Sequence, residues 1–468
     1  MQSLAERFRK KYIGDRAFYQ QVLTVAVPIL IQNFITNFVS MLDNIMVGQV
    51  GTEQMSGVAI VNQLMFVYNL CIFGGLAGAG IFTAQYYGKG DQEGVRHTFR
   101  YKLVLGLLLT GIATALFLGA GEKLIGLYLQ GDADGSDSAA ALYWGEQYLR
   151  VMLLGLPPFL AVQVYATTLR ECSETVVPMK AGITAVLVNL CFNYLLIYGK
   201  LGFPQMGVVG AAVATVIARY VEAIIVVGWT HRHIERNPWA SGVYQTLRVP
   251  AQRMREYTVK GSPLLFNEVL WSVGEAFLVQ CYSVRGLSVV AALNISNTFG
   301  NLFMITFFTM GSAVSIIVGQ LLGAGEMAEA KDKDNKLIFT AMLIALGISI
   351  LYYLVAPLFP QMYNTTDTVR ALATRFMRMS CFFMVQMAFL HTTYFTLRAG
   401  GRTVITFFFD CGSTWLLSVP IAYGLTRLTD LDVVYVYMMV MLGNFIKCAV
   451  GYVLLRKNVW LNNIVEKA

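Results

Sequence analysis

The stretch that decides the fold runs from Val22 to Val47 and reads VLTVAVPILIQNFITNFVSMLDNIMV. It is long enough to cross the hydrocarbon core of a bilayer as a helix, which takes ~20 residues. Asp43 is the only acidic or basic side chain within it. A carboxylate is costly at membrane depth, so such a residue is by default a candidate for an ion or proton site. The stretch therefore predicts a membrane protein that transports ions or solutes.

The composition of the whole chain is also that of a membrane protein. Its 468 residues are 56% apolar and 13% charged, whereas soluble domains average about 25% charged residues. The mean hydropathy is +0.58. Because lipid offers the backbone no hydrogen-bond partner, about twelve long apolar runs are expected to be spanning helices. The predicted spans are Val22–Val47, Ala59–Thr83, Leu103–Ala120, Ala139–Leu169, Gly182–Tyr198, Val208–Trp229, Thr258–Tyr282, Leu287–Val318, Leu337–Ala356, Ala371–Leu397, Val404–Leu425 and Val434–Leu455.

Lysine and arginine gather in alternate loops, which predicts the orientation of the chain. The basic segments are the N-terminal segment, Lys89–Lys102, Arg232–Lys260, Lys331–Lys336, Arg398–Arg402 and the C-terminal tail. The connections Gly48–Ser56 and Ala120–Ser138 are poor in basic residues. By the positive-inside rule, the basic loops and both termini are expected on the cytoplasmic side of the plasma membrane. The net charge of +8 is therefore attributed to orientation and not to a nucleic-acid partner.

The cysteines and histidines show no pattern of metal binding or catalysis. The seven cysteines are odd in number and lie mostly in apolar runs, without paired spacing. Of the four histidines, only His231 and His233 are close in sequence, and they lie on a basic loop. A membrane enzyme would need a His/Asp, His/Glu or Ser/Lys constellation on one side of the membrane, and the sequence offers no convincing example. We expect no catalytic residue, no metal site and no resident cofactor.

The two halves of the chain repeat each other. At an offset of about 235 residues, the matching pairs are Pro28 and Pro263, Asn62 and Asn297, Gln85 and Gln320, Gly88 and Gly323, and Gly90 and Gly325. Farther along, an offset of about 228 residues places Arg219 opposite Lys447. Pro28 and Pro263 cannot donate a helical hydrogen bond, so each is a predicted hinge at which its helix can bend.

This duplication predicts an all-α protein with two six-helix lobes. The N-terminal lobe is expected at residues 1–235, a cytoplasmic connecting loop at 236–256 and the C-terminal lobe at 257–468. Because each lobe has an even number of spans, the lobes share one orientation and a pseudo-two-fold axis along the membrane normal. Substrate is expected to bind between them, and a chain that carries its own lobe interface can work as a monomer.

Four motifs then carry a resemblance to a known family. They are Pro28 followed by Asp43–Gly48, the segment Gln85–Gly90, the segment Asn189–Gly199, and Leu397–Thr403. In order and spacing they resemble the multidrug and toxic compound extrusion (MATE) transporters of the MOP exporter superfamily, over nearly the whole chain. The resemblance implies an antiporter that exports cationic or amphipathic organic compounds in exchange for H⁺ or Na⁺. It also implies a V-shaped pair of lobes that rocks between inward-open and outward-open states.

The residues themselves predict a coupling site in the N-terminal lobe. With the N-terminus inside, Asp43 and Thr215 fall in the outer part of their helices and Asn189 and Asn193 in the middle and outer half of theirs, so all four overlap roughly in depth. Asn189 and Asn193 are four residues apart and therefore share one helical face. One carboxylate, two amide carbonyls and a hydroxyl make an all-oxygen set that suits a hard cation. The acid could equally take up a proton, because burial disfavours the charged form of a carboxyl group.

The chain departs from one branch of the resembled family at this site. Some relatives have Asp at the position of Asn193, which completes a site with two carboxylates. Here an amide leaves Asp43 as the only acid, which argues against tight Na⁺ binding and leaves a weak Na⁺ site open. In other relatives a helix 10 acid contributes to a C-terminal cation site, whereas Phe382–Thr396 contains no carboxylate.

Three acids in the C-terminal lobe are candidates for substrate binding or for a second coupling site. They are Glu268, Glu275 and Asp410. Two interpretations stay open at this point. The acids could attract cationic substrate or relay protons, or they could pair with polar neighbours such as Asn267 and Trp415.

The substrate lining is expected to be soft and deformable, because thioethers and aromatic rings adapt to flat cations. Met65 and Phe307 are the candidates we favour from the apolar residues, together with Asn62 and its repeat mate Asn297. The main rival is a lipid or lipid-linked precursor flippase of the same superfamily. A flippase would be favoured by a strongly basic cavity, whereas the intramembrane charges found here are mainly acidic.

Overall fold

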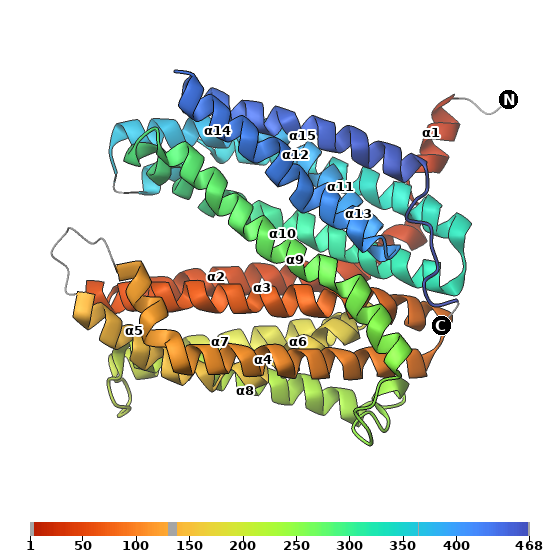
Figure 1. The fold of residues 1–468 in the computed structure, drawn as a ribbon, viewed down its shortest axis with the longest axis horizontal. Helices are drawn as coiled ribbons and strands as arrows, with labels where there is room; N and C mark the ends of the chain where they lie inside the picture. Colours follow the sequence, from red (N-terminus) through yellow and green to blue (C-terminus); the bar gives the residue numbers. More distant parts are fainter. Residues whose placement is uncertain (1–3, 130–137, 364, 467–468) are drawn as a thin grey trace. The chain divides into compact units, whose positions relative to one another are not determined.

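The structure is a computed structural model that describes residues 4–129, 138–363 and 365–466. Every regular element in these ranges is a helix (Figure 1). The helices are α1 (Leu4–Tyr12), α2 (Arg16–Gly48), α3 (Thr52–Lys89), α4 (Gln92–Leu129), α5 (Ser138–Leu153), α6 (Leu156–Glu171), α7 (Val176–Tyr198), α8 (Gly207–Arg232), α9 (Ala251–Ser283), α10 (Leu287–Ala324), α11 (Met327–Val355), α12 (Asp367–Ala399), α13 (Thr403–Phe407), α14 (Val419–Leu428) and α15 (Val433–Arg456). Short 3-10 turns occur at Pro238–Ala240 and Phe359–Met362.

The predicted all-helical membrane architecture is confirmed. Among the described helices, ten are long and apolar enough to cross a bilayer, and up to eleven if a bent pair is counted as one span. α12 holds the predicted span Ala371–Leu397 and falls outside that count. α9 already begins at Ala251, inside the predicted loop 236–256.

Two predicted spans are less regular than the apolar pattern suggests. The span Ala139–Leu169 is the bent pair α5 and α6, whose axes differ by 49°. Pro157 and Pro158 open α6, where their missing N–H groups cost no helical hydrogen bond. The span Val404–Leu425 contains two π-helical segments, Phe408–Gly412 and Thr414–Ser418. Such segments are rare and are frequently found at functional sites.

The chain divides into two compact units. The N-terminal unit comprises residues 27–83 and 92–258, and the C-terminal unit comprises the residues up to 26, residues 84–91 and those from 259 onward. In the N-terminal unit α7 packs along α8, and α6 packs against both α4 and α8. In the C-terminal unit α12 packs along α10 and α11, and α15 covers α12. Figure 1 shows the long helices of each unit running side by side.

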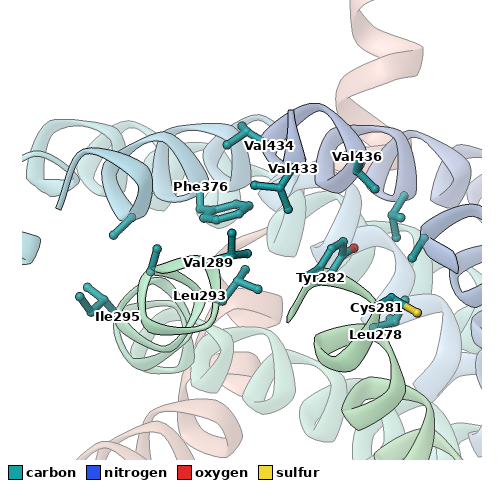
Figure 2. Close-up of a cluster of buried hydrophobic side chains, with 14 of the residues drawn as sticks. Leu278, Cys281, Tyr282, Val289, Leu293, Ile295, Phe376, Val433, Val434 and Val436 are labelled. Carbon is teal, nitrogen blue, oxygen red and sulfur yellow. The ribbon is translucent and has the colours of Figure 1, made fainter. Parts of the chain in front are cut away.

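The core of the C-terminal unit joins five helices. Figure 2 shows Tyr282 of α9, Leu293 of α10, Phe376 of α12 and Val436 of α15 converging in one buried apolar cluster, to which α14 also contributes. Lipid tails are as apolar as these side chains, so close packing, and not transfer out of water, must supply most of the stabilisation.

Candidate functional site

A cavity of about 370 Å³ lies wholly within the N-terminal unit. Residues of α2, α3, α5, α7 and α8 line it. Its polar residues include all four members of the predicted coupling site, Asp43, Asn189, Asn193 and Thr215. Residues separated by more than 170 positions in the chain are therefore brought to one surface. The structure thus brings together the four residues that helix depth had grouped in the sequence.

Asp43 is held by two amide groups. Asn193 Nδ2 donates to Asp43 Oδ1 at 2.6 Å. The Asn189 amide satisfies its neighbours best with its nitrogen towards the acid, where it donates to Oδ2 at 2.9 Å and to Oδ1 at 3.0 Å. In that orientation the Asn189 oxygen accepts from Thr215 Oγ1 at 3.2 Å. The carboxylate is thus an acceptor of several N–H groups, which suits its charged form.

The orientation of the amides differs from the one expected for a cation site. We expected the carbonyl oxygens of Asn189 and Asn193 to face Asp43. The Asn193 nitrogen faces it instead, and the Asn189 amide also satisfies its neighbours best with its nitrogen towards the acid. Asn193 Oδ1 is buried and has no hydrogen-bond partner among the described residues. A hard cation needs oxygen ligands, so both amides would have to rotate before one could bind.

Two further predicted residues line the cavity, and an unpredicted tyrosine joins them. Asn62 and Met65 of α3 both contribute to the wall. Tyr148 of α5 is buried, lines the same wall, and donates from its hydroxyl to Asn62 Oδ1 at 3.5 Å. Nothing in the sequence around Tyr148 distinguishes it from the other tyrosines, because its role depends on the bend between α5 and α6.

An ion pair that we did not predict as part of the site also lines the cavity. Arg219 Nη1 lies 3.1 Å from Glu222 Oε2, and the Arg219 guanidinium stacks on Phe159 with 5.2 Å to the ring centroid. Thr215, Arg219 and Glu222 follow one another at helical spacing along one face of α8. The sequence could have indicated this pair, because two opposite charges three residues apart are unusual inside an apolar run.

In the C-terminal unit, Asp410 and Glu268 are paired with polar neighbours. Asp410 Oδ1 lies 2.8 Å from Lys447 Nζ, and Asp410 Oδ2 accepts from Asn267 Nδ2 at 3.1 Å. Glu268 Oε1 accepts from the Tyr394 hydroxyl at 3.2 Å. Pairing with Asn267, one of the two interpretations left open by the sequence, is therefore what the structure shows for Asp410.

The remaining candidates lie outside the cavity around Asp43. Glu275 is an exposed side chain close enough to Asp410 and Lys447 to interact with them electrostatically, and Asn297 is also exposed. Phe307 is only 1% exposed and packs in an apolar cluster with Phe299 and Tyr352, and it does not line the cavity around Asp43. Trp415 Nε1 donates to the Leu270 carbonyl and not to an acid. Among the described residues, no group of three His, Cys, Asp or Glu could hold a metal ion.

The fold and the cavity together define a polytopic membrane transporter. The family model described as MatE matches residues 28–195 and 263–424. The chain belongs to the MatE, or MATE, family of transporters, as the sequence motifs predicted. It is therefore a transporter and not an enzyme.

Individual relatives agree with this membership over most of their length. The probable multidrug resistance protein NorM of Thermotoga maritima is 24% identical over 412 residues, which cover 87% of this chain and 86% of that protein. The multidrug resistance protein MdtK of Pectobacterium atrosepticum is 27% identical over 423 residues, covering 88% and 89%. A MOP superfamily transporter from Pyrococcus furiosus, described as having a binding pocket of reverse polarity, matches with a TM-score of 0.84 at 19% identity over 98% of this chain and 99% of that one. This likeness confirms the MATE fold.

Proposed function

We propose that the protein is a secondary antiporter that exports cationic or amphipathic organic compounds in exchange for an inward-moving ion. The multidrug resistance proteins NorM and MdtK resemble it over more than four fifths of its length, which supports the substrate class. The cavity of the N-terminal unit is the proposed binding place, and its wall combines Met65 and Phe66 with polar groups. Thioether and aromatic groups of this kind adapt to flat organic cations.

The observation that carries the proposal is an acid held by uncharged partners in a cavity. Asp43 receives hydrogen bonds from two amides, which carry no charge. In a low-dielectric cavity one carboxylate is neutralised by a single cation, and a second cation would be repelled. The coupling ion and the organic cation would therefore compete for the same charge. Competition for one site between two ligands on opposite sides of a membrane is what exchange requires.

The amide orientation favours H⁺ over Na⁺ as the coupling ion. If Asn193 rotated, its oxygen would face Asp43 Oδ1 across the 2.6 Å now bridged by an N–H group, which requires a proton between the two oxygens. Protonated Asp43 would then donate to Asn193 Oδ1, the acceptor that has no partner among the described residues. Sodium would instead need both amides to rotate and several oxygens to converge. The proton requires the smaller rearrangement.

Exchange also needs a conformational change that moves the site from one side of the membrane to the other. Pro28 lies inside α2 and Pro263 inside α9. Each lies within a few residues of a boundary between the two compact units, at 26/27 and 258/259. Because proline interrupts helical hydrogen bonding, these are the places at which the helices bend most easily. We propose that a monomer in the plasma membrane, with both termini cytoplasmic, works in this way.

The test is transport of an organic cation into or out of proteoliposomes, with H⁺ and Na⁺ gradients imposed separately. We expect a proton gradient to drive transport by the native protein and not by Asp43→Asn. Asp332→Asn, which changes an exposed acid of α11, is the matched control and should behave as the native protein does. Transport that survives Asp43→Asn would contradict the site and move coupling to Glu268, Glu275 or Asp410. Absence of ion-driven transport for any organic cation would contradict antiport and favour a lipid flippase.

A further inference from the structure

We propose that Arg219 sets the charge number of the preferred substrate, so that the cavity selects singly charged organic cations over doubly charged ones. The inference rests on the proposed function for its substrate class. It concerns a residue that has no part in the coupling site around Asp43. Its basis is the number and placement of charges on the cavity wall.

The wall carries two acids and one base. Among the described residues that line the cavity, the acidic and basic side chains are Asp43, Glu222 and Arg219, and Tyr148 is the one other titratable group. Arg219 offsets one of the two carboxylates through its 3.1 Å contact with Glu222. One negative charge is left over when Asp43 is ionised, which a monovalent cation balances. Without Arg219 there would be two.

The two members of the pair are placed differently. The Glu222 side chain is 6% exposed and that of Arg219 is 36% exposed, so the guanidinium is the more accessible member of the pair. Thr215, whose hydroxyl belongs to the Asp43 cluster, lies four residues before Arg219 on the same face of α8. The rise of an α-helix places those two positions ~6 Å apart along the axis. A cation that approaches Asp43 is therefore within range of the Arg219 charge.

The other charges near Glu222 do not line the cavity and form a constant background. Arg170 of α6 is close enough to interact electrostatically with Glu222, and its Nη2 donates to Gln32 Oε1 at 2.7 Å. Lys102 Nζ lies 2.5 Å from Glu171 Oε2. Lys102 and Glu171 offset each other, whereas Arg170, whose partner Gln32 is uncharged, acts on Glu222 from outside the wall to the same extent in every variant of Arg219. A substitution of Arg219 thus changes the charge of the wall by one without removing any of these contacts.

A basic residue at this position is also present in the other half of the repeat. Lys447 corresponds to Arg219 and pairs with Asp410. The partner acid of Lys447 comes from the π-helical segment Phe408–Gly412, whereas Glu222 is on the same helix as Arg219. In both units an acid neutralises the basic residue at this position, but the acid comes from the same helix in the N-terminal unit and from another helical segment in the C-terminal unit. Only the pair in the N-terminal unit lines the cavity that contains Asp43.

The test compares two dyes that share a phenanthridinium ring, ethidium with one positive charge and propidium with two. Binding of each to the purified full-length protein is measured by fluorescence at one pH. Arg219→Gln should raise the affinity for propidium relative to ethidium by on the order of tenfold. The substitution removes a positive charge ~6–8 Å from the bound dye, so the net charge of the wall becomes more negative by one. Glu222→Gln should shift the ratio in the opposite direction. The double variant Arg219→Gln/Glu222→Gln has the native wall charge and should return the ratio to its native value.

Arg219→Lys keeps the charge and should also keep the native ratio. A ratio that is equal in Arg219→Gln and in the double variant, or unchanged throughout the series while ethidium binds, would overturn the role of Arg219 and leave the proposed function intact. If ethidium and propidium both fail to bind the native protein, the proposed function fails and the inference fails with it. Thermal unfolding of each variant checks that a changed ratio does not come from a damaged fold.

Discussion

Gly88 and Gly323 occupy corresponding positions of the internal repeat, and each lies against the backbone of the helix that carries the other. A Cβ atom on Gly88 would lie 1.9 Å from the Gln320 carbonyl oxygen, and a Cβ atom on Gly323 would lie 1.9 Å from the Gln85 carbonyl oxygen. Both glycines belong to the C-terminal unit. The end of α3 and the end of α10 therefore cross at a distance that only glycine allows at both positions.

Alanine at either glycine should destabilise the C-terminal unit. The added methyl group meets backbone atoms, which cannot move aside as a flexible side chain can, so we expect a cost of at least about 1–3 kcal/mol for Gly88→Ala and for Gly323→Ala. Thermal unfolding in detergent measures it. Gly347→Ala is the control, because a Cβ atom on that helical glycine meets nothing within 4 Å. Equal melting temperatures for all three variants would show that α3 and α10 can move apart at this crossing without loss of stability.

The sequence predicted this fold because bilayer thickness and backbone hydrogen bonding leave few choices for an apolar segment. The same constraint predicted overlapping depths for Asp43, Asn189 and Thr215, which line one cavity, and the spacing of four residues predicted that Asn193 shares a helical face with Asn189. It could not fix amide orientation, which depends on the hydrogen-bond partners that each group finds after packing. Carbonyl oxygens were expected towards Asp43, whereas the Asn193 nitrogen is found there and the Asn189 amide is better satisfied with its nitrogen there as well.

Other features depend on which way a side chain faces within the packed bundle. Phe307 and Met65 look alike as apolar residues of apolar spans, yet only Met65 lines the cavity. Arg219 carries a charge inside an apolar run, but the sequence indicated only that it corresponds to Lys447 in the repeat and not that it lines the cavity. The apolar pattern does not reveal the two π-helical segments of residues 408–418, because each widens a helical turn by i→i+5 hydrogen bonds and shifts the register without changing composition.

The C-terminal tail is held by hydrogen bonds to the Gln85 side chain, and loss of that side chain should release the tail. Gln85 Nε2 donates to the Ala399 carbonyl at 3.0 Å and to the Asn462 carbonyl at 3.2 Å, and its Oε1 accepts from the Ile464 N–H at 2.8 Å. Trp460 of the same tail is 1% exposed. In Gln85→Leu these backbone groups lose a buried partner, which costs about 1–3 kcal/mol for each group left unpaired.

Limited proteolysis of the tail measures this release. We expect faster cleavage after Lys457 in Gln85→Leu than in the native protein, and a lower melting temperature. Gln361→Leu, which changes an exposed glutamine that donates only to the Pro357 carbonyl, should leave both unchanged. A tail that stays protected in Gln85→Leu would mean that its other contacts, such as the bond from Lys89 Nζ to the Val465 carbonyl and the burial of Trp460, hold it without Gln85.

The Asp410–Lys447 pair should behave as a structural ion pair whose members depend on each other. Their side chains are 22% and 11% exposed, and 2.8 Å separates the charged atoms. Lys447→Met leaves the acid without its counter-charge and should cost about 3–5 kcal/mol of stability. The double variant Asp410→Asn/Lys447→Met removes both charges and should recover most of the loss. Unfolding and dye transport are measured together. A double variant that is stable but does not transport would give Asp410 a part in coupling.

Asn193→Asp should convert the site around Asp43 into one that responds to Na⁺. Asn193 Nδ2 lies 2.6 Å from Asp43 Oδ1, so the substitution brings two carboxylates together, and one of them must hold a proton or share a cation. Two carboxylates and the Thr215 hydroxyl supply the oxygen ligands that the native amides withhold. We expect Na⁺, but not an equal concentration of choline, to raise the melting temperature of Asn193→Asp and to drive transport. The native protein and Asn193→Leu should show neither response. A native protein that is stabilised by Na⁺ as strongly as Asn193→Asp would show that its amides rotate readily and would replace H⁺ with Na⁺ as the favoured coupling ion.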